Sequence, residues 1–158
     1  MTRPTWDEYF MAMAYLASTR STDRDTRHGA VIVNQRRHVI ATGYNGFPRG
    51  LPDHVYPDTR PGKYDVMVHA EANALVNCEG LTGGAVLYVT GCPCPPCMAM
   101  AINAGIRRVV TGTVKSECVD EARAELTRRM AKDCLIQFET LAGEVGGLMA
   151  RIGDLVRR

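Results

Sequence analysis

The sequence predicts a three-layer α-β-α fold of the α/β class, built on a mixed five-stranded sheet, and three observations lead to this prediction. The length of 158 residues is that of one domain. Short apolar runs of strand length alternate with longer segments in which apolar residues recur every three or four positions. From the third strand onward, helices and strands alternate, and such crossovers give parallel, right-handed neighbours. We therefore expect a single domain over residues 1–158, with its core at about 5–140.

The first part of the chain is expected to form a helix and a hairpin. Over residues 5–19 the apolar side chains follow the spacing of one helix face, and Thr5 or Thr2 is suited to cap the helix. Residues 29–33 form an uninterrupted apolar run that is typical of a buried strand. Residues 38–43 return beside it after a polar turn, as the second strand of a hairpin.

A long loop and a regular alternation of helices and strands follow. Residues 44–64 contain seven Gly or Pro residues, and a loop of this length inside a compact domain is usually functional. The later elements are expected at about 69–77 (helix), 85–89 (strand), 95–103 (helix), 107–111 (strand), 118–131 (helix), 135–138 (strand) and 141–156 (helix). This order places helices on both faces of the sheet.

The composition is that of an ordinary soluble globular protein, with 46% hydrophobic and 23% charged residues. No apolar run approaches the roughly 20 residues that a membrane span needs, and the polar N-terminal segment is unlike a secretory signal. We therefore expect a cytoplasmic protein without a membrane partner. The 19 basic and 17 acidic residues nearly balance, which does not favour a protein that grips long nucleic acid. The balance still leaves a few cations for a small anionic substrate.

Two segments carry the chemistry: His69-Ala70-Glu71 and Pro93-Cys94-Pro95-Pro96-Cys97. Three of the six cysteines crowd into residues 92–97, and this crowding favours one soft metal ion over a disulfide framework. The combination of H-x-E with P-C-x-x-C is the signature of the zinc deaminases.

The physical chemistry of the two motifs agrees with this signature. A catalytic zinc ion uses three protein ligands and keeps its fourth position for water. His69, Cys94 and Cys97 supply one imidazole and two thiolates, and both segments are expected to begin helices, whose N-termini favour the thiolate form. Glu71 is then turned away from the metal but stays near the water, where a carboxylate can transfer protons. We expect one Zn²⁺ per chain.

Two other interpretations stay open at this point. Cys92 could complete a purely structural site with four protein ligands, which would describe a non-catalytic, zinc-stabilised module. Alternatively, Cys94 and Cys97 could form a redox pair. Glu71 distinguishes the catalytic interpretation, because a structural site has no use for it.

Further segments accompany the two motifs. They are Gly29-Ala30 at the start of a strand, Gly43-Tyr44-Asn45-Gly46 after the second strand, Asn73 after His-Ala-Glu, and Leu87-Tyr88-Val89-Thr90 before the cysteines. With these residues the chain resembles the zinc-dependent cytidine deaminase superfamily, and within it the deoxycytidylate (dCMP) deaminases. The resemblance implies a cytidine deaminase-like fold and the hydrolytic deamination of a cytosine deoxynucleotide, dCMP, to dUMP and ammonia. Another base, a nucleoside or a tRNA adenosine is the alternative substrate.

The resemblance also implies roles for single residues. His69, Cys94 and Cys97 are expected to bind zinc, and Glu71 to transfer protons. For the substrate, the resemblance implies that Asn45 holds the sugar hydroxyl, that the Ala70 backbone faces the pyrimidine, and that Arg24 and Arg27 hold the phosphate. Lys115, in the loop after the fourth strand, is a further candidate for the phosphate because ligands of open α/β sheets bind at that end of the strands.

The chain departs from the family pattern at one position that bears on specificity. The family commonly has an aromatic residue after the fourth strand, where residues 113–117 of this chain have none. The family is generally oligomeric and often regulated by deoxynucleoside triphosphates, which implies a homo-oligomer with dCTP or dTTP as possible effectors. The predicted C-terminal helix has an apolar stripe that fits a subunit contact, or else covers the chain's own sheet. The stripe contains Leu141, Val145, Leu148, Met149, Ile152 and Leu155.

Overall fold

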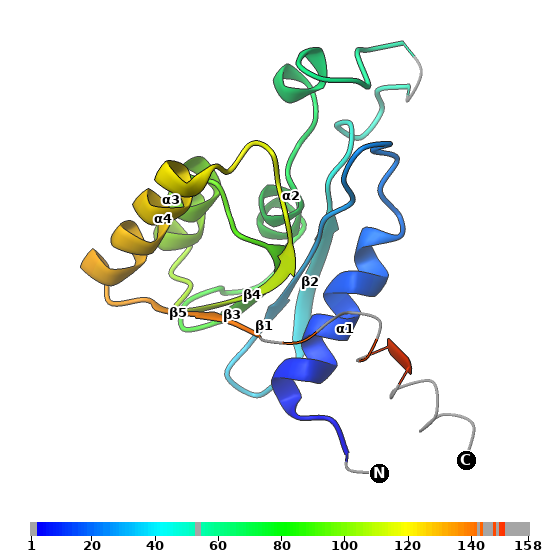
Figure 1. Ribbon diagram of the computed structural model, residues 1–158. Helices are drawn as coiled ribbons and strands as arrows, with labels where there is room; N and C mark the ends of the chain where they lie inside the picture. The colour runs from blue at the N-terminus through cyan, green and yellow to red at the C-terminus, as the bar shows by residue number, and fades with distance from the viewer. Residues whose placement is uncertain (1–2, 53–54, 142, 144–146, 148, 151–158) are drawn as a thin grey trace.

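The computed structural model shows helices on both faces of a five-stranded sheet (Figure 1). It describes residues 3–52, 55–141, 143, 147 and 149–150. The strands are β1 (Gly29–Val33), β2 (Val39–Tyr44), β3 (Val86–Gly91), β4 (Arg108–Val114) and β5 (Gln137–Thr140). The helices are α1 (Trp6–Ser18), α2 (Ala70–Val76), α3 (Pro95–Asn103) and α4 (Glu121–Asp133), with a short 3₁₀ helix, η1 (Gly62–Asp65), before α2. The predicted three-layer fold with a mixed five-stranded sheet is confirmed.

The strand order is β2-β1-β3-β4-β5. β1 is antiparallel to both of its neighbours, whereas β3, β4 and β5 are parallel, as the crossovers predict. Val89 near the end of β3 pairs with Ala30 at the start of β1 and with Thr111 in β4. The beginning of β1 and the carboxyl ends of β3 and β4 therefore meet at one edge of the sheet.

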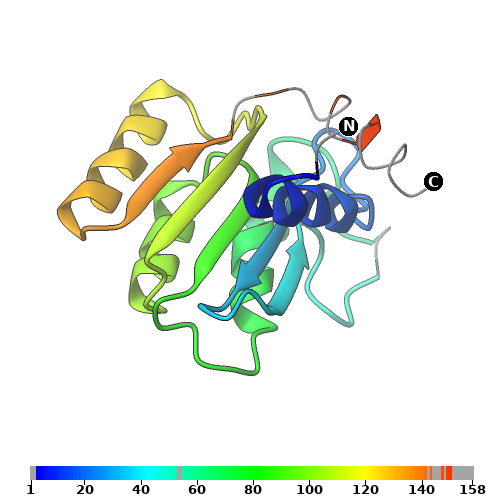
Figure 2. The same cartoon turned by 90° about the horizontal axis from the view of Figure 1, so that it is seen from below.

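Successive side chains of a strand point to opposite faces of the sheet, and both faces are apolar. One face is covered by α1 and the other by α2, α3 and α4 (Figures 1 and 2). Val31 and Tyr88 point to one face and pack against Phe10 of α1. The other face packs against α2, α3 and α4. Its buried residues include Ile32, Leu87, Val89, Val109, Ala74, Met98 and Ala131.

Capping explains where two of the helices begin. Thr5 and Glu8 form a reciprocal capping box at the start of α1, which confirms one of the two predicted caps. The side chain of Asp120 accepts a hydrogen bond from the Arg123 N–H, so α4 begins at Glu121 rather than at residue 118.

The predicted C-terminal helix at 141–156 falls largely outside the described residues, including Val145, Leu148, Ile152 and Leu155 of its apolar stripe. Leu141 packs against the cluster that contains α1. Within the described part of the chain, no helix is long and apolar enough to cross a membrane.

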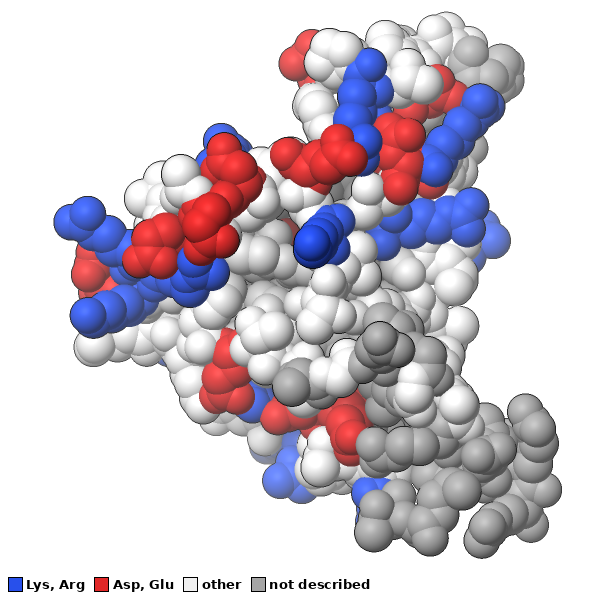
Figure 3. Space-filling view, viewed as in Figure 1, with Lys and Arg blue, Asp and Glu red and all other residues white. Residues whose placement is uncertain are grey.

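Charged side chains of both signs are interleaved on the face shown in Figure 3. On α4, Arg128 pairs with Glu125 and Arg129 pairs with Asp133, one helical turn apart. Basic residues on this helix are therefore partly neutralised by acidic neighbours.

Candidate active site

The two chemical motifs begin helices, as predicted. His69 is the N-cap residue of α2 and Cys94 is the N-cap residue of α3, and both have extended backbone conformations. Neither side chain makes a capping hydrogen bond, so both are available for other contacts. Pro95 and Pro96 occupy the first turn of α3, where a missing N–H costs nothing. Cys97 follows within the same turn.

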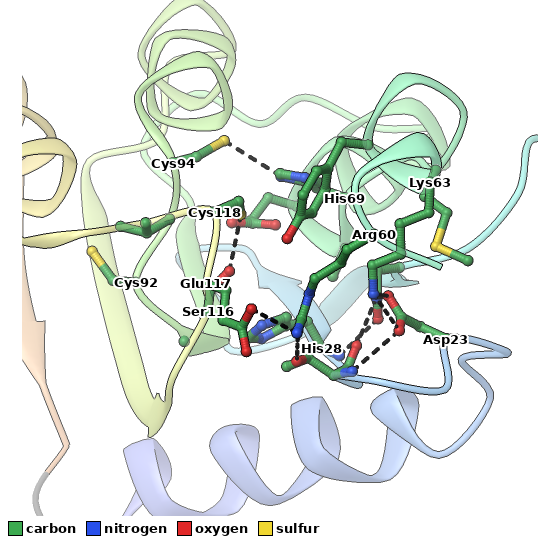
Figure 4. Close-up of a pocket in the computed structure, with 18 residues that line it drawn as sticks. Asp23, His28, Arg60, Lys63, His69, Cys92, Cys94, Ser116, Glu117 and Cys118 are labelled. Carbon is green, nitrogen blue, oxygen red and sulfur yellow. Dashed lines mark hydrogen bonds and ion pairs between the residues drawn. The ribbon is translucent and has the colours of Figure 1, made fainter. Parts of the chain in front are cut away.

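The side chains of His69, Cys94 and Cys97 converge, and their ligand atoms all lie within 4.8 Å of one another. His69 Nδ1 is 3.4 Å from Cys94 Sγ, a contact drawn in Figure 4, and 3.5 Å from Cys97 Sγ. One imidazole nitrogen and two sulfurs at this spacing suit the tetrahedral coordination that Zn²⁺ prefers. The three residues therefore fit a catalytic type of zinc site, with three protein ligands.

Cys92 does not belong to this cluster. Its Sγ contacts the carbonyl oxygen of Pro93 at 3.6 Å, and Figure 4 places it apart from the contact between His69 and Cys94. Among the described residues, the group that can hold a metal consists of three side chains. A structural site with Cys92 as the fourth ligand is thus not formed in this part of the chain.

The surroundings of the two thiols shift their pKa values in opposite directions. The hydrogen bond from Cys97 lowers the pKa of the Cys94 thiol, and the His69 ring lowers it further, although burial opposes the shift. The same hydrogen bond, together with burial, raises the pKa of the Cys97 thiol. Binding of a metal at this site must therefore release the proton that Cys97 retains.

Glu71 lies in the first turn of α2, and its side chain is only 5% exposed. Burial raises the pKa of this carboxyl group to about 7, while the nearby His69 ring opposes the shift. A carboxyl group with this pKa can both accept and donate a proton near neutral pH. It lines the same pocket as His69 and Cys94, and its role in proton transfer stays a prediction.

A pocket opens beside the cluster at the edge of the sheet where β1 begins and β3 and β4 end (Figure 4). It is lined by residues from 23–28, 45, 60–71, 91–94 and 116–119. His69, Ala70, Glu71 and Cys94 all belong to this lining. Ala70 is fully buried, and its role toward the substrate stays a prediction.

The chain matches the model of a known protein family. Residues 4–113 match the model of the cytidine and deoxycytidylate deaminase zinc-binding region. The chain belongs to this deaminase family. It is 41% identical over 146 residues to a probable deoxycytidylate deaminase of Drosophila melanogaster, which covers 85% of this chain and 71% of the relative. It is 45% identical over 125 residues to the deoxycytidylate deaminase of Mycobacterium phage D29, across 70% of this chain and 96% of the relative.

The fold of the deaminase also matches a solved structure. The dCMP deaminase of cyanophage S-TIM5, crystallised in complex with dCMP and dUMP, superposes with a TM-score of 0.71 and 26% sequence identity. The match covers 89% of this chain and 100% of the other.

Asn45 lies in the pocket of the deaminase, and its amide group is held from three sides. Its Nδ2 donates to Asp23 Oδ2 at 3.1 Å and to the carbonyl oxygen of Thr26 at 2.9 Å. Its Oδ1 accepts a hydrogen bond from the His28 backbone N–H at 2.7 Å. Both N–H groups are thus used by the protein, and the remaining capacity of Asn45 is as an acceptor at Oδ1.

The structure places the predicted phosphate ligands at the periphery. The side chain of Arg24 is 77% exposed and pairs with Asp58 at 3.2 Å. Arg27 and Lys115 are also exposed, and none of the three belongs to the lining of the pocket.

Two other cations line the pocket, Arg60 and Lys63, and both come from the end of the long segment after β2. Arg60 pairs with Glu117 at 2.6 Å, whereas Lys63 is 3% exposed and pairs with Asp23. The Gly and Pro content of this segment predicted a functional loop. It did not single out these two side chains.

Proposed function

We propose that this chain is a zinc-dependent deaminase that hydrolyses dCMP to dUMP and ammonia, as a single deaminase domain over residues 1–158. The observation that carries the proposal is the buried carboxyl group of Glu71 beside the His69, Cys94 and Cys97 cluster, in one pocket. The names of the relatives and of the superposed structure supply the substrate. A non-catalytic zinc module would have no use for Glu71.

The residues divide the reaction between them. His69, Cys94 and Cys97 would hold the zinc ion, which when bound supplies a Lewis acid that makes water nucleophilic near neutral pH. Glu71 accepts a proton from the water that attacks carbon four of the pyrimidine. It donates this proton to ring nitrogen three, then accepts the second proton from the hydroxyl group that the attack leaves on carbon four and donates it to the amino group, which leaves as ammonia when the carbon–nitrogen bond breaks. The pKa of Glu71, raised to about 7 by burial, suits both transfers.

Recognition of the nucleotide requires groups for the sugar and for the phosphate. Asn45 is the proposed ligand of the sugar hydroxyl, which it can meet through Oδ1, and the Ala70 backbone faces the base. Arg24 and Arg27 are sequence neighbours of the pocket-lining residues Asp23, Thr26 and His28, and Lys115 is the neighbour of Ser116. We therefore propose all three as phosphate ligands. Arg60, whose side chain lines the pocket, is a fourth candidate.

A substrate panel tests the proposal. The zinc-loaded protein is incubated with dCMP, dCTP, deoxycytidine, cytosine and a tRNA that contains the wobble adenosine, and ammonia release is measured for each. We expect dCMP to be the best substrate. Faster turnover of a nucleoside, a free base or the tRNA would refute dCMP as the substrate. Absence of ammonia release from all of these compounds would refute the proposal that the protein is a deaminase.

On the basis of the family resemblance, we also propose that the protein acts in the cytoplasm as a homo-oligomer and that dCTP and dTTP modulate it. Light scattering at micromolar concentration tests the association, since a monomer would refute it. Rates measured with and without each triphosphate test the regulation.

A further inference from the structure

His28 is a pocket residue to which neither the sequence motifs nor the proposed mechanism gives a role. It immediately precedes β1 and lines the pocket together with Asn45 and Glu71. Its ring lies against the backbone of Gly91, because a Cβ atom added at Gly91 would be 2.7 Å from His28 Cε1. The imidazole therefore occupies the edge of the sheet directly beside the segment that carries the cysteines.

The neighbour of His28 Nδ1 identifies the tautomer. Nδ1 lies 3.2 Å from Oγ1 of Thr90, a fully buried residue of β3. Thr90 Oγ1 also accepts a hydrogen bond from the Gly29 N–H at 3.1 Å. Among the described residues, the Thr90 hydroxyl has no acceptor other than His28 Nδ1. The Gly29 N–H, the Thr90 hydroxyl and His28 Nδ1 are all hydrogen-bonded when Thr90 donates to Nδ1, and this assignment places the ring proton on Nε2.

Nε2 of His28 is buried and has no hydrogen-bond partner in the part of the chain that the structure describes. Burial lowers the pKa of the ring to about 4, with a smaller contribution from the neighbouring His69, so the imidazole is neutral at neutral pH. Buried polar groups are nearly always paired, so an unpaired one at a pocket takes its partner from outside the protein, either a water molecule or a ligand atom that replaces it. Here the unpaired group is a neutral N–H donor.

We propose that His28 binds the substrate by donating a hydrogen bond from Nε2–H to an oxygen acceptor of the nucleotide. This inference rests on the proposed function and adds a specificity-determining residue to it. The acceptor is the carbonyl oxygen of the base or the 3′ oxygen of the sugar, because the proposed ligands of the phosphate are the arginines and Lys115. The backbone N–H of His28 already holds Asn45, so the same residue orients one proposed substrate ligand and supplies another.

Steady-state kinetics on dCMP test the proposal with three variants. His28→Leu removes the donor, His28→Gln restores an N–H donor on a flexible side chain, and His38→Leu is the control at the opposite end of β1. We expect His28→Leu to lower kcat/KM by about 10- to 100-fold, since it leaves a buried substrate acceptor unpaired. His28→Gln should recover most of this loss. Zinc content should stay that of the unmodified protein in each variant. Because His28→Leu also leaves the buried Thr90 hydroxyl without its acceptor, its melting temperature should fall, and the kinetics are measured well below it.

Substrate analogues then identify the acceptor. The ratio of kcat/KM between the unmodified protein and His28→Leu is measured for 2-thio-dCMP and for 2′,3′-dideoxycytidine monophosphate. The ratio should collapse toward one for the analogue that lacks the contacted oxygen. Unchanged kcat/KM in His28→Leu, or a penalty that persists undiminished with both analogues, would overturn the inference. Failure of the proposed function is seen separately, in the substrate panel with the unmodified protein, whereas failure of this inference is seen only in the comparison of the His28 variants.

Discussion

Lys63 Nζ lies 2.8 and 2.9 Å from the two carboxylate oxygens of Asp23, and both side chains are buried. This pair joins the long segment after β2 to the segment that precedes β1. Asp23 also accepts a hydrogen bond from Asn45, so the position of a proposed substrate ligand depends on the same carboxylate. A second carboxylate, that of Asp25, approaches Lys63 at 2.7 Å.

We expect Lys63→Met to lower the free energy of unfolding by about 3 kcal/mol, because it leaves the buried carboxylate of Asp23 without its partner. Lys132→Met, which changes an exposed lysine of α4, is the matched control and should have almost no effect. Chemical denaturation of the three proteins measures the difference. An equal effect of the two substitutions would contradict a stabilising role for the buried pair.

The same pair should make stability depend on pH. Burial opposes ionisation of Asp23, but the hydrogen bond from Lys63, the backbone N–H groups of Asp25 and Thr26 and the charge of Lys63 together outweigh it and hold the pKa of Asp23 below its usual value. The pair therefore stabilises the fold above the unfolded-state pKa, at about 4, and this stabilisation is lost as the pH falls through the lower folded-state pKa. Unfolding measured between pH 7 and pH 2.5 should show the difference between the unmodified protein and Lys63→Met shrinking below about pH 4. A difference that is constant with pH would show that Asp23 is not responsible.

Replacement of Glu71 by Ala should leave zinc content and fold intact while lowering turnover by about two to four orders of magnitude, the usual range of general acid–base catalysis. Glu79→Ala, at an exposed acidic position after α2, is the control. In the unmodified protein, kcat/KM should fall on the acid side with a midpoint at or below pH 7, because protonated Glu71 cannot accept a proton and a bound cation favours the carboxylate. A rate close to normal in Glu71→Ala would remove this residue from the mechanism.

The metal centre predicts opposite outcomes for two cysteines that are two residues apart. Cys94→Ala should lose most of the bound zinc, whereas Cys92→Ala should retain one zinc ion per chain, because Cys92 lies outside the cluster of ligand atoms. Metal analysis after dialysis against a weak chelator distinguishes them. Full retention by Cys94→Ala, or loss by Cys92→Ala, would require a different ligand set.

Phosphate recognition should separate dCMP from deoxycytidine. Arg24→Ala and Arg60→Ala are each expected to reduce kcat/KM for dCMP and to leave the slower reaction of deoxycytidine unchanged. A shielded, charge-assisted contact corresponds to about 10- to 100-fold, and the larger effect is expected for Arg60, which lines the pocket. Arg129→Ala on α4 is the control. Equal losses on both substrates would indicate damage to the pocket rather than a lost phosphate contact.

The sequence predicted most of the fold because its signals are local. The apolar run at 29–33, the cap at Thr5 and the two prolines before Cys97 each act within a few residues. The three metal-ligand candidates could also be predicted, because the two motifs that contain them begin helices at predictable places. Their convergence within 4.8 Å follows from the order of the strands.

The contacts of Arg60, Lys63 and His28 could not be predicted, because they join segments that are distant in sequence. Lys63 meets Asp23 forty positions away, and His28 meets Thr90 across two paired strands. No periodicity in residues 44–64 indicates where the segment returns to the sheet. Conversely, Arg24 sits in a segment that reaches the pocket, yet its side chain points to solvent and to Asp58. Sequence position alone does not show whether a side chain lines the pocket, as that of Arg60 does, or points to solvent, as that of Arg24 does.

The positions of the pocket residues along the chain have a consequence for how the substrate specificity of this enzyme can change. All three metal-ligand candidates and Glu71 lie before residue 98, whereas the wall formed by residues 116–119 enters the pocket only from the far end of β4. Substitutions in that wall can therefore change which molecule is accepted without touching the groups that carry out the reaction. The stretch without an aromatic residue at 113–117 lies at this adjustable position, where a new preference could arise while the metal centre is inherited unchanged.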